Sequence, residues 1–172
     1  MKRVMLLIMI VGVVSCSVFT KFTQVDIKPL AVNEFLVKPF GFNESIDNFK
    51  QKMPYKTKIQ KLIKRSSREN HRPDTIYNFN FKKSKISVYK TRFNQEFVLG
   101  GIVKNSEIEL VNGIRQGMKR DDFFKSFVDL PENRKDTVIV KDFQLDRAFN
   151  FYFDKRNRLS KFTFTGRKAT SN

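Results

Sequence analysis

Residues 77–103 read YNFNFKKSKISVYKTRFNQEFVLGGIV, and this stretch decides the fold class. Aromatic residues alternate with asparagine over its first five positions, and Ile86 and Val88 flank a serine. Apolar residues then alternate again from Phe97 onward, across a pair of glycines. A period of two is typical of antiparallel strands that bury one face. We therefore predict three strands here, with a turn at residues 92–95 between the second and the third.

A second stretch of similar character follows the turn signal Asn112-Gly113. Residues 117–131 favour a helix, because apolar side chains share one side of it and Pro131 ends it. After it, three further strands are predicted at residues 136–143, 147–153 and 158–165.

Two helices are expected between the N-terminal region and the first strands. The first would cover residues 43–53, with Asn43 as its N-cap and Pro54 at its end. The second would cover residues 55–68, since Ile59, Leu62 and Ile63 have the spacing of one buried helical stripe.

The predicted fold class is α+β. We expect two tandem helix-plus-three-strand repeats, at residues 40–111 and 112–166, which form a mostly antiparallel sheet with helices on one face. The first repeat would carry the basic helix as an insertion at residues 55–72. Residues 167–172 are expected to form a disordered tail.

The amino-acid composition argues against most kinds of metal site and catalytic site. The chain has 172 residues with one Cys and one His, whereas zinc sites need about four ligands and most Cys or Ser nucleophiles need a histidine base. His71 lies in a polar segment and reads as a solvated loop residue. We expect no enzyme activity, no catalytic residues, no metal and no cofactor.

Paired acidic residues do not change this expectation. Asp121 and Asp122 are adjacent at a predicted helix start, where they point about 100° apart and complement the helix dipole. Asp142, Asp146 and Asp154 do not have the spacing of a calcium loop.

The first sixteen residues predict a location. A positive start is followed by an apolar run over residues 4–14 and then by Ser15 and Cys16, which is the pattern of a short secretory signal. Residues 13–16, Val-Val-Ser-Cys, resemble a bacterial lipobox. The resemblance implies that residues 1–15 are removed and that Cys16 is acylated, with residues 16–39 as a lipidated tether. The alternative is an uncleaved signal anchor, which also places the domain outside the cytoplasm.

No acidic residue follows Cys16 until Asp26, which by resemblance to bacterial sorting rules favours the outer membrane, facing the periplasm. An inner-membrane or monoderm plasma-membrane anchor is the alternative. Loss of Lys2 and Arg3 with the leader leaves a charge of +15 from the original +17.

The second half resembles the SmpA/OmlA-type lipoproteins of outer-membrane assembly, whose domain is shared with β-lactamase-inhibitor-protein-like folds. The residues that carry the resemblance are Ile114, Gly117-Met118, Pro131, Phe153-Asp154 and Leu159. The chain departs from that pattern at Lys119, where a capping Ser or Thr is expected, and at Leu130, where a glycine commonly precedes the proline. The resemblance implies a binding or assembly role and covers about 50 residues.

The expected helical insertion concentrates positive charge. From Lys50 to Arg68 there are eight basic residues and no acidic one, so a helix there would place like charges four residues apart. The predicted anionic-partner residues are Lys56, Lys58, Lys61, Lys64, Arg65 and Arg68. A lysine-rich composition throughout the chain explains the same run without any function.

Two functions follow as hypotheses. In the first, a lipid-anchored, non-enzymatic module docks on an envelope protein or on an anionic membrane surface. In the second, a periplasmic inhibitor or ligand binder uses the sheet face, which would require aromatic anchors such as Tyr89 and Tyr152 in one patch. Nucleic acid is not expected as a partner, because the predicted compartment lacks it.

Overall fold

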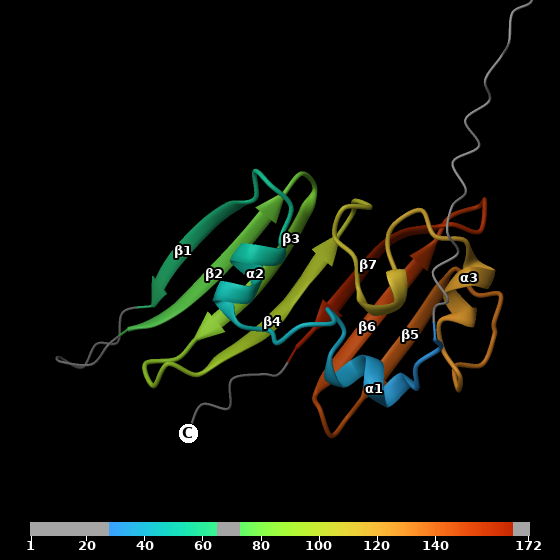
Figure 1. Cartoon of the computed structure of the whole chain (residues 1–172), viewed down its shortest axis with the longest axis horizontal. Coiled ribbons are helices and arrows are strands. Elements are labelled where there is room, and N and C mark those ends of the chain that lie inside the picture. Colours follow the sequence, from blue (N-terminus) through green and yellow to red (C-terminus); the bar gives the residue numbers. More distant parts are fainter. Residues whose placement is uncertain (1–27, 65–72, 167–172) are drawn as a thin grey trace, which may run out of the picture.

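The computed structural model describes residues 28–64 and 73–166. Within these ranges seven strands form one antiparallel sheet in the order β1-β2-β3-β4-β7-β6-β5 (Figure 1). The strands are β1 (Lys58–Lys64), β2 (Asp74–Phe81), β3 (Ser84–Lys90), β4 (Glu96–Val103), β5 (Thr137–Asp142), β6 (Arg147–Phe153) and β7 (Leu159–Thr165).

The sheet consists of two meanders that meet at their last strands. Strands β1 to β4 pair in sequence order, as do β5 to β7, and β4 pairs antiparallel with β7. The junction runs from Gly100 opposite Thr165 to Val103 opposite Phe162. It is the contact that makes one sheet out of two local units.

Three short α-helices lie on one face of this sheet (Figure 1). They are α1 (Val32–Val37), α2 (Ile46–Lys52) and α3 (Arg120–Lys125), and a single 3-10 turn, η1, covers Val111–Gly113. Each helix contributes a fully buried phenylalanine that packs on sheet phenylalanines. The ring pairs are Phe35 with Phe149, Phe49 with Phe79, and Phe123 with Phe151, at centroid distances of 5.1, 5.5 and 4.7 Å.

The aromatic residues that alternate with polar residues in the sequence produce this fold because they pack on one face of the sheet. Phe149, Phe151 and Phe153 all project toward the helices, as do Phe162 and Phe164 of the neighbouring strand, and all five are buried. Edge-to-face and stacked ring pairs add about 0.5–1.5 kcal/mol each beyond burial. The core is therefore a phenylalanine layer between sheet and helices.

The prediction of two helix-plus-three-strand repeats is wrong. The first half contains four strands, and the molecule is mainly one seven-stranded antiparallel sheet with three short helices. The extra strand is β1, whose seven residues occupy half of the stretch predicted as a basic helix, residues 55–68.

The apolar residues of β1 fit the spacing of a strand as well as the spacing of a helix. Ile59 and Ile63 are four residues apart, as in a helix, but they also share one side of a strand, on which they lie opposite Phe79 and Thr75. Pairing with β2 satisfies the backbone hydrogen-bonding groups of β1. The extended strand also separates like charges that a helix would have placed four residues apart on the same side. The remainder of the predicted insertion, residues 65–72, lies outside the described residues.

Other boundaries differ in detail. Ser45, not Asn43, caps α2, because its hydroxyl accepts from the Asn48 amide at 3.2 Å. Within the predicted tether, α1 buries Phe35 and Leu36. The strands predicted at residues 77–103 and 136–165 and the turn at residues 92–95 are confirmed.

A bulge in β4 fits the two meanders together. Ser87 lies opposite Gly100 and Val88 opposite Val98, so Leu99 is one extra residue on β4. A Cβ on Gly101 would lie 2.6 Å from the Lys85 carbonyl oxygen and 2.8 Å from the Phe164 ring. Only glycine allows both neighbouring strands to approach here.

The second face of the sheet, which we call the open face, is not covered by any of the described helices. Side chains that point to it alternate with the core residues, and the register brings polar pairs together on it. Ser87 donates to Asn78 at 2.7 Å and Asn150 donates to Thr163 at 3.4 Å. The open face is therefore mostly polar in its central rows.

Candidate functional site

The structure places four of the six predicted anionic-partner residues in the edge strand β1 of the described sheet or in the turn before it. Lys56 lies in the turn before β1 with a left-handed φ of 73°, and Lys58, Lys61 and Lys64 belong to β1 itself. Arg65 and Arg68 lie outside the described residues, as do Cys16 and His71.

The strand does not bring these lysines onto one surface. Lys58 points to the open face opposite Asn80, whereas Lys61 points to the helix-bearing face opposite Tyr77. The Lys61 Nζ atom lies 5.8 Å from the centre of the Tyr77 ring. A partner would therefore meet the basic residues along an edge, from both sides, and not as a helical stripe.

Positive charge extends well beyond β1. Residues 50–95 hold 14 of the 34 Lys and Arg of the chain but only 2 of its 17 Asp and Glu. These residues include β1 to β3, so the charge belongs to the first meander and its connections. The excess of basic residues over residues 50–95 is visible in the sequence, whereas the predicted basic run covers only residues 50–68.

Six lysines of this region have no acidic partner in the part of the fold that the structure describes. Ion pairs in the described ranges join Lys50 to Asp47 at 2.8 Å and Lys90 to Glu96 at 2.9 Å, and Lys82 to Glu107. The other exposed lysines of the meander have no acidic partner among the described residues; they are Lys52, Lys56, Lys58, Lys61, Lys83 and Lys85. This surface can attract anions over a distance of about 8–10 Å at moderate salt.

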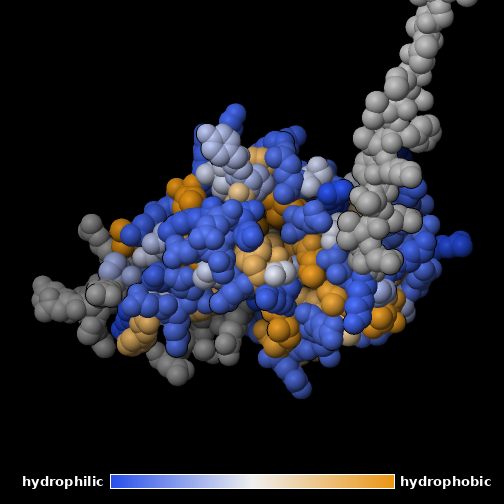
Figure 2. All heavy atoms as spheres, in the orientation of Figure 1, coloured by the Kyte–Doolittle hydropathy of each residue, from blue (hydrophilic) through white to orange (hydrophobic). Residues whose placement is uncertain are grey.

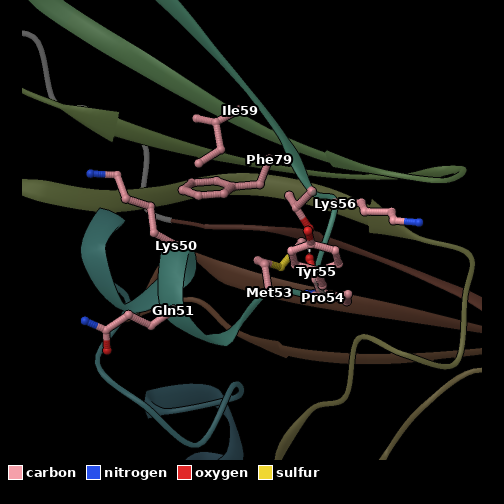
Figure 3. A pocket seen from close by; sticks show the side chains of 9 residues that line it. Lys50, Gln51, Met53, Pro54, Tyr55, Lys56, Ile59 and Phe79 are labelled. Atoms are coloured by element: carbon pink, nitrogen blue, oxygen red, sulfur yellow. Dashed lines mark hydrogen bonds between the residues drawn. The ribbon is translucent and has the colours of Figure 1, made fainter.

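A shallow open cavity of about 370 Å³ lies between the end of α2 and the start of β1 (Figure 3). Met53, Ile59 and Phe79 form apolar walls, and Lys50 and Lys56 also line the cavity, with their ammonium ends pointing away from these three side chains. Tyr55, another lining residue, is 90% exposed. The cavity contains neither a carboxylate nor an imidazole among its lining residues, so it offers no acid–base pair.

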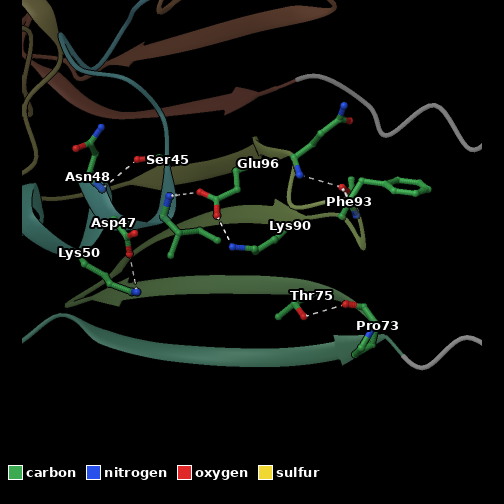
Figure 4. A network of polar contacts seen from close by, with 12 residues as sticks. Ser45, Asp47, Asn48, Lys50, Pro73, Thr75, Lys90, Phe93 and Glu96 are labelled. Carbon is green, nitrogen blue, oxygen red and sulfur yellow. Dashed lines mark hydrogen bonds and ion pairs between the residues drawn. The ribbon is translucent and has the colours of Figure 1, made fainter. Parts of the chain in front are cut away.

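Glu96 accepts two of the hydrogen bonds in the polar network drawn in Figure 4. Its carboxylate accepts from the Ile46 amide at 2.8 Å and from Lys90 Nζ at 2.9 Å, so it joins α2 to the β3–β4 hairpin. The hydrogen bond to Glu96 raises the pKa of Lys90. Because Glu96 and Ile46 are 50 residues apart, sequence spacing alone did not indicate this contact.

The two tyrosines considered as sheet-face anchors both point to the open face, but at different ends of it. Tyr89 packs on Phe97 at 5.1 Å and donates to Asp74 at 2.5 Å, and burial together with this bond raises its pKa to about 12. Tyr152 lies beneath Lys161, 4.4 Å from its Nζ, next to the β6–β7 turn. They do not form one patch.

The acidic residues serve local structure. Asp142 accepts from the amides of Gln144 and Leu145 in its hairpin. Asp154 accepts from the amides of Arg156 and Arg158, and these bonds lower its pKa. Asp121 and Asp122 are exposed in the first turn of α3. In the described part of the chain, no cluster of three or more His, Cys, Asp or Glu side chains is suited to a metal ion.

None of the helices within residues 28–64 and 73–166 combines the length and the apolar content needed to cross a bilayer. Comparison of the chain with protein-family models, with curated proteins and with solved structures finds no match. The resemblance to SmpA/OmlA-type lipoproteins and the lipobox stay predictions.

Proposed function

We propose that this protein is a lipid-anchored, non-enzymatic module of the bacterial cell envelope whose domain docks on an anionic membrane surface. The observation that carries the proposal is the excess of unpaired lysines on the first meander, within residues that hold 14 basic and 2 acidic side chains. A basic residue close to an anionic bilayer contributes about 1 kcal/mol of binding free energy. Acylation at Cys16 would hold the domain close enough for these small contributions to add.

The distance from the anchor to the domain permits this arrangement. Lys28, the first described residue, is twelve positions after Cys16, and a chain of that length spans at most about 40 Å. Strands of seven or eight residues are about 25 Å long. Either end of the sheet can therefore face a membrane to which Cys16 is attached.

The alternative, an inhibitor or ligand binder that uses the sheet face, has less support. It requires aromatic anchors gathered in one patch, and Tyr89 and Tyr152 lie at different ends of a face whose centre is polar.

Vesicle sedimentation tests the docking step without the anchor. The chain beginning at Ser17 keeps every described element, and it should bind vesicles that contain phosphatidylglycerol, more weakly as salt rises, and should not bind neutral vesicles. The double variant Lys58→Glu/Lys85→Glu should reduce binding, whereas the control Lys119→Glu/Lys125→Glu, on and beside α3, should have a smaller effect. Equal binding to neutral and anionic vesicles would contradict the proposal.

Anchoring has a separate test. Mass spectrometry of the mature protein extracted from membranes should find an acylated Cys16 at the N-terminus. An unmodified Cys16 that still follows residues 1–15 would contradict this part of the proposal.

A further inference from the structure

Two hairpins of the sheet lie at the same end. Strands β4 and β6 both pair antiparallel with β7, so they run in the same direction and start at one end of the sheet. The β3–β4 connection, residues 91–95, and the β5–β6 connection, residues 143–146, therefore lie at the same end, and Figure 1 shows both along its lower edge, with the end of β7 between them. Strand β4 continues four residues beyond Gly100 toward this end, whereas β6 continues one residue beyond Ala148, so the two tips are also staggered.

Both hairpins expose apolar side chains. Phe93 is 72% exposed, Phe143 is 83% exposed and Leu145 is 38% exposed. A cation lies over each phenylalanine ring: Arg92 Cζ is 4.8 Å from the centre of Phe93, and Lys141 Nζ is 4.6 Å from the centre of Phe143. We call these five residues the hairpin rim.

The opposite end of the sheet has a different composition. Its hairpin turns, residues 82–83 and 154–158, contain only polar and charged side chains, although Tyr55 in the α2–β1 connection is exposed there. Exposed phenylalanines in the described ranges are restricted to the hairpin rim. The hairpin turns of the two ends therefore differ: those at one end carry exposed phenylalanines, and those at the other carry only polar and charged side chains.

The rim hairpins are held in shape. The Phe93 amide donates to the Thr91 hydroxyl at 3.2 Å, and the Asn94 amide donates to the Thr91 carbonyl at 3.0 Å. In the other hairpin the Asp142 carboxylate accepts two turn amides, at 2.6 and 3.1 Å. This carboxylate is thus committed to the turn. The aromatic rings can be buried without the cost of ordering a loose loop.

We propose that the hairpin rim is the surface with which the domain enters the interface of a bilayer that contains anionic phospholipid. Two tips at one end of the sheet, each with an exposed ring beside a cation, match a surface that is apolar inside and anionic at its boundary. The rings would enter the acyl region while Arg92 and Lys141 bind phosphates. The charge of the first meander provides the long-range attraction, so this inference rests on the proposed function and assigns it an orientation.

Tryptophan scanning tests the orientation directly, because the chain has no Trp. Three single variants of the chain beginning at Ser17 each acquire one probe: Phe93→Trp, Phe143→Trp and the control Tyr55→Trp, which lies at the opposite end and is 90% exposed in the parent. With phosphatidylglycerol vesicles, emission from the two rim probes should shift to the blue and be quenched by brominated acyl chains. The control probe should do neither.

A binding measurement complements the spectra. The double variant Phe93→Ser/Phe143→Ser should weaken vesicle binding by roughly tenfold or more, since two apolar contacts are lost. The control Tyr55→Ser, at the opposite end of the sheet, should weaken binding far less. Circular dichroism of each variant should match the parent, because the three side chains lie outside the core.

The possible failures are distinct. If the parent binds anionic vesicles but only the Tyr55→Trp probe responds, or if no probe responds, the rim is not the docking surface and the proposed function survives. If the parent does not bind these vesicles at all, the proposed function fails and this inference fails with it. If the rim probes respond to native envelope vesicles but not to protein-free vesicles of the same lipid, the partner is a protein and both membrane proposals are wrong.

Discussion

Arg147 and Glu44 form a buried bidentate ion pair between β6 and the segment before α2. The Nη2 and Nη1 atoms of Arg147 lie 2.6 and 3.0 Å from the two carboxylate oxygens, and Nη1 also donates to the Leu36 carbonyl at 2.8 Å. Both side chains are 14% exposed. The pair therefore joins α1, the segment before α2 and the second meander at one point.

This pair predicts a pH-dependent loss of stability in Arg147→Met. Burial raises the pKa of Glu44 even in the presence of Arg147, which acts in the opposite direction. Without Arg147 the pKa should rise further, because an unpaired buried carboxylate favours its protonated form. A carboxyl group with a raised folded-state pKa is most favourable below its unfolded pKa and loses that advantage as pH rises through the folded value.

We therefore expect Arg147→Met to cost about 3–5 kcal/mol of unfolding free energy at pH 7.5 and clearly less at about pH 4.5. Urea unfolding at the two pH values measures this. The control Arg115→Met breaks an exposed pair with Glu109, of 3.3 Å, and should cost less than about 1 kcal/mol. An equal loss for Arg147→Met at both pH values would show that Glu44 does not titrate as argued.

Gly101→Ala should destabilise the junction between the meanders. The added Cβ would meet the Lys85 carbonyl oxygen and the Phe164 ring at less than 3 Å, so β3 and β7 must move apart, at a cost of about 1–3 kcal/mol. Gly41→Ala is the control, because its φ of 71° strains alanine although no atom lies within 4 Å of the new Cβ. Thermal unfolding should show a larger loss of stability for Gly101→Ala than for Gly41→Ala. A larger loss for Gly41→Ala would argue against the close approach of β3 and β7 at Gly101.

Arg120→Lys should destabilise the protein although both side chains are positively charged. The Arg120 guanidinium donates to the carbonyls of Asn133 and Lys135 and to the Asn157 side chain, at 3.1, 2.8 and 3.2 Å. It also lies 4.3 Å from the Phe153 ring centre. An ammonium group cannot make this planar set of contacts, so we expect a loss of about 2–3 kcal/mol in urea unfolding.

Arg158→Lys provides the comparison for Arg120→Lys. Arg158 is exposed and donates one side-chain bond, to the Gly117 carbonyl at 2.9 Å. Its replacement should cost less than about 1 kcal/mol. Comparable losses at the two positions would mean that the burial of Arg120 contributes little.

The strands of residues 77–103 were predictable because their partners are adjacent in sequence and their turns are local. The helical prediction at β1 failed because Ile59 and Ile63 fit both periods, and only the free edge of β2 decides between them. Pairing of β4 with β7 depends on the fit of Gly100 and Gly101 against Phe164, which no local pattern encodes.

The candidate site was predictable as a basic region but not as a surface. Charge counting located the region, whereas the faces of Lys58 and Lys61 depend on the register with β2. Phe143 gave no signal in the sequence, because a phenylalanine beside a valine-rich strand normally belongs to the core. Its exposure follows from the end of β5 at Asp142.

The free edge of β1 has one more consequence. An unpaired edge strand with three exposed aliphatic side chains is a template on which a second chain can add, the first step of fibril growth. Lys58 and Lys61 belong to that edge strand, so a second copy that paired there would bring cations close to cations. The same lysines that favour an anionic partner therefore oppose self-association along this edge.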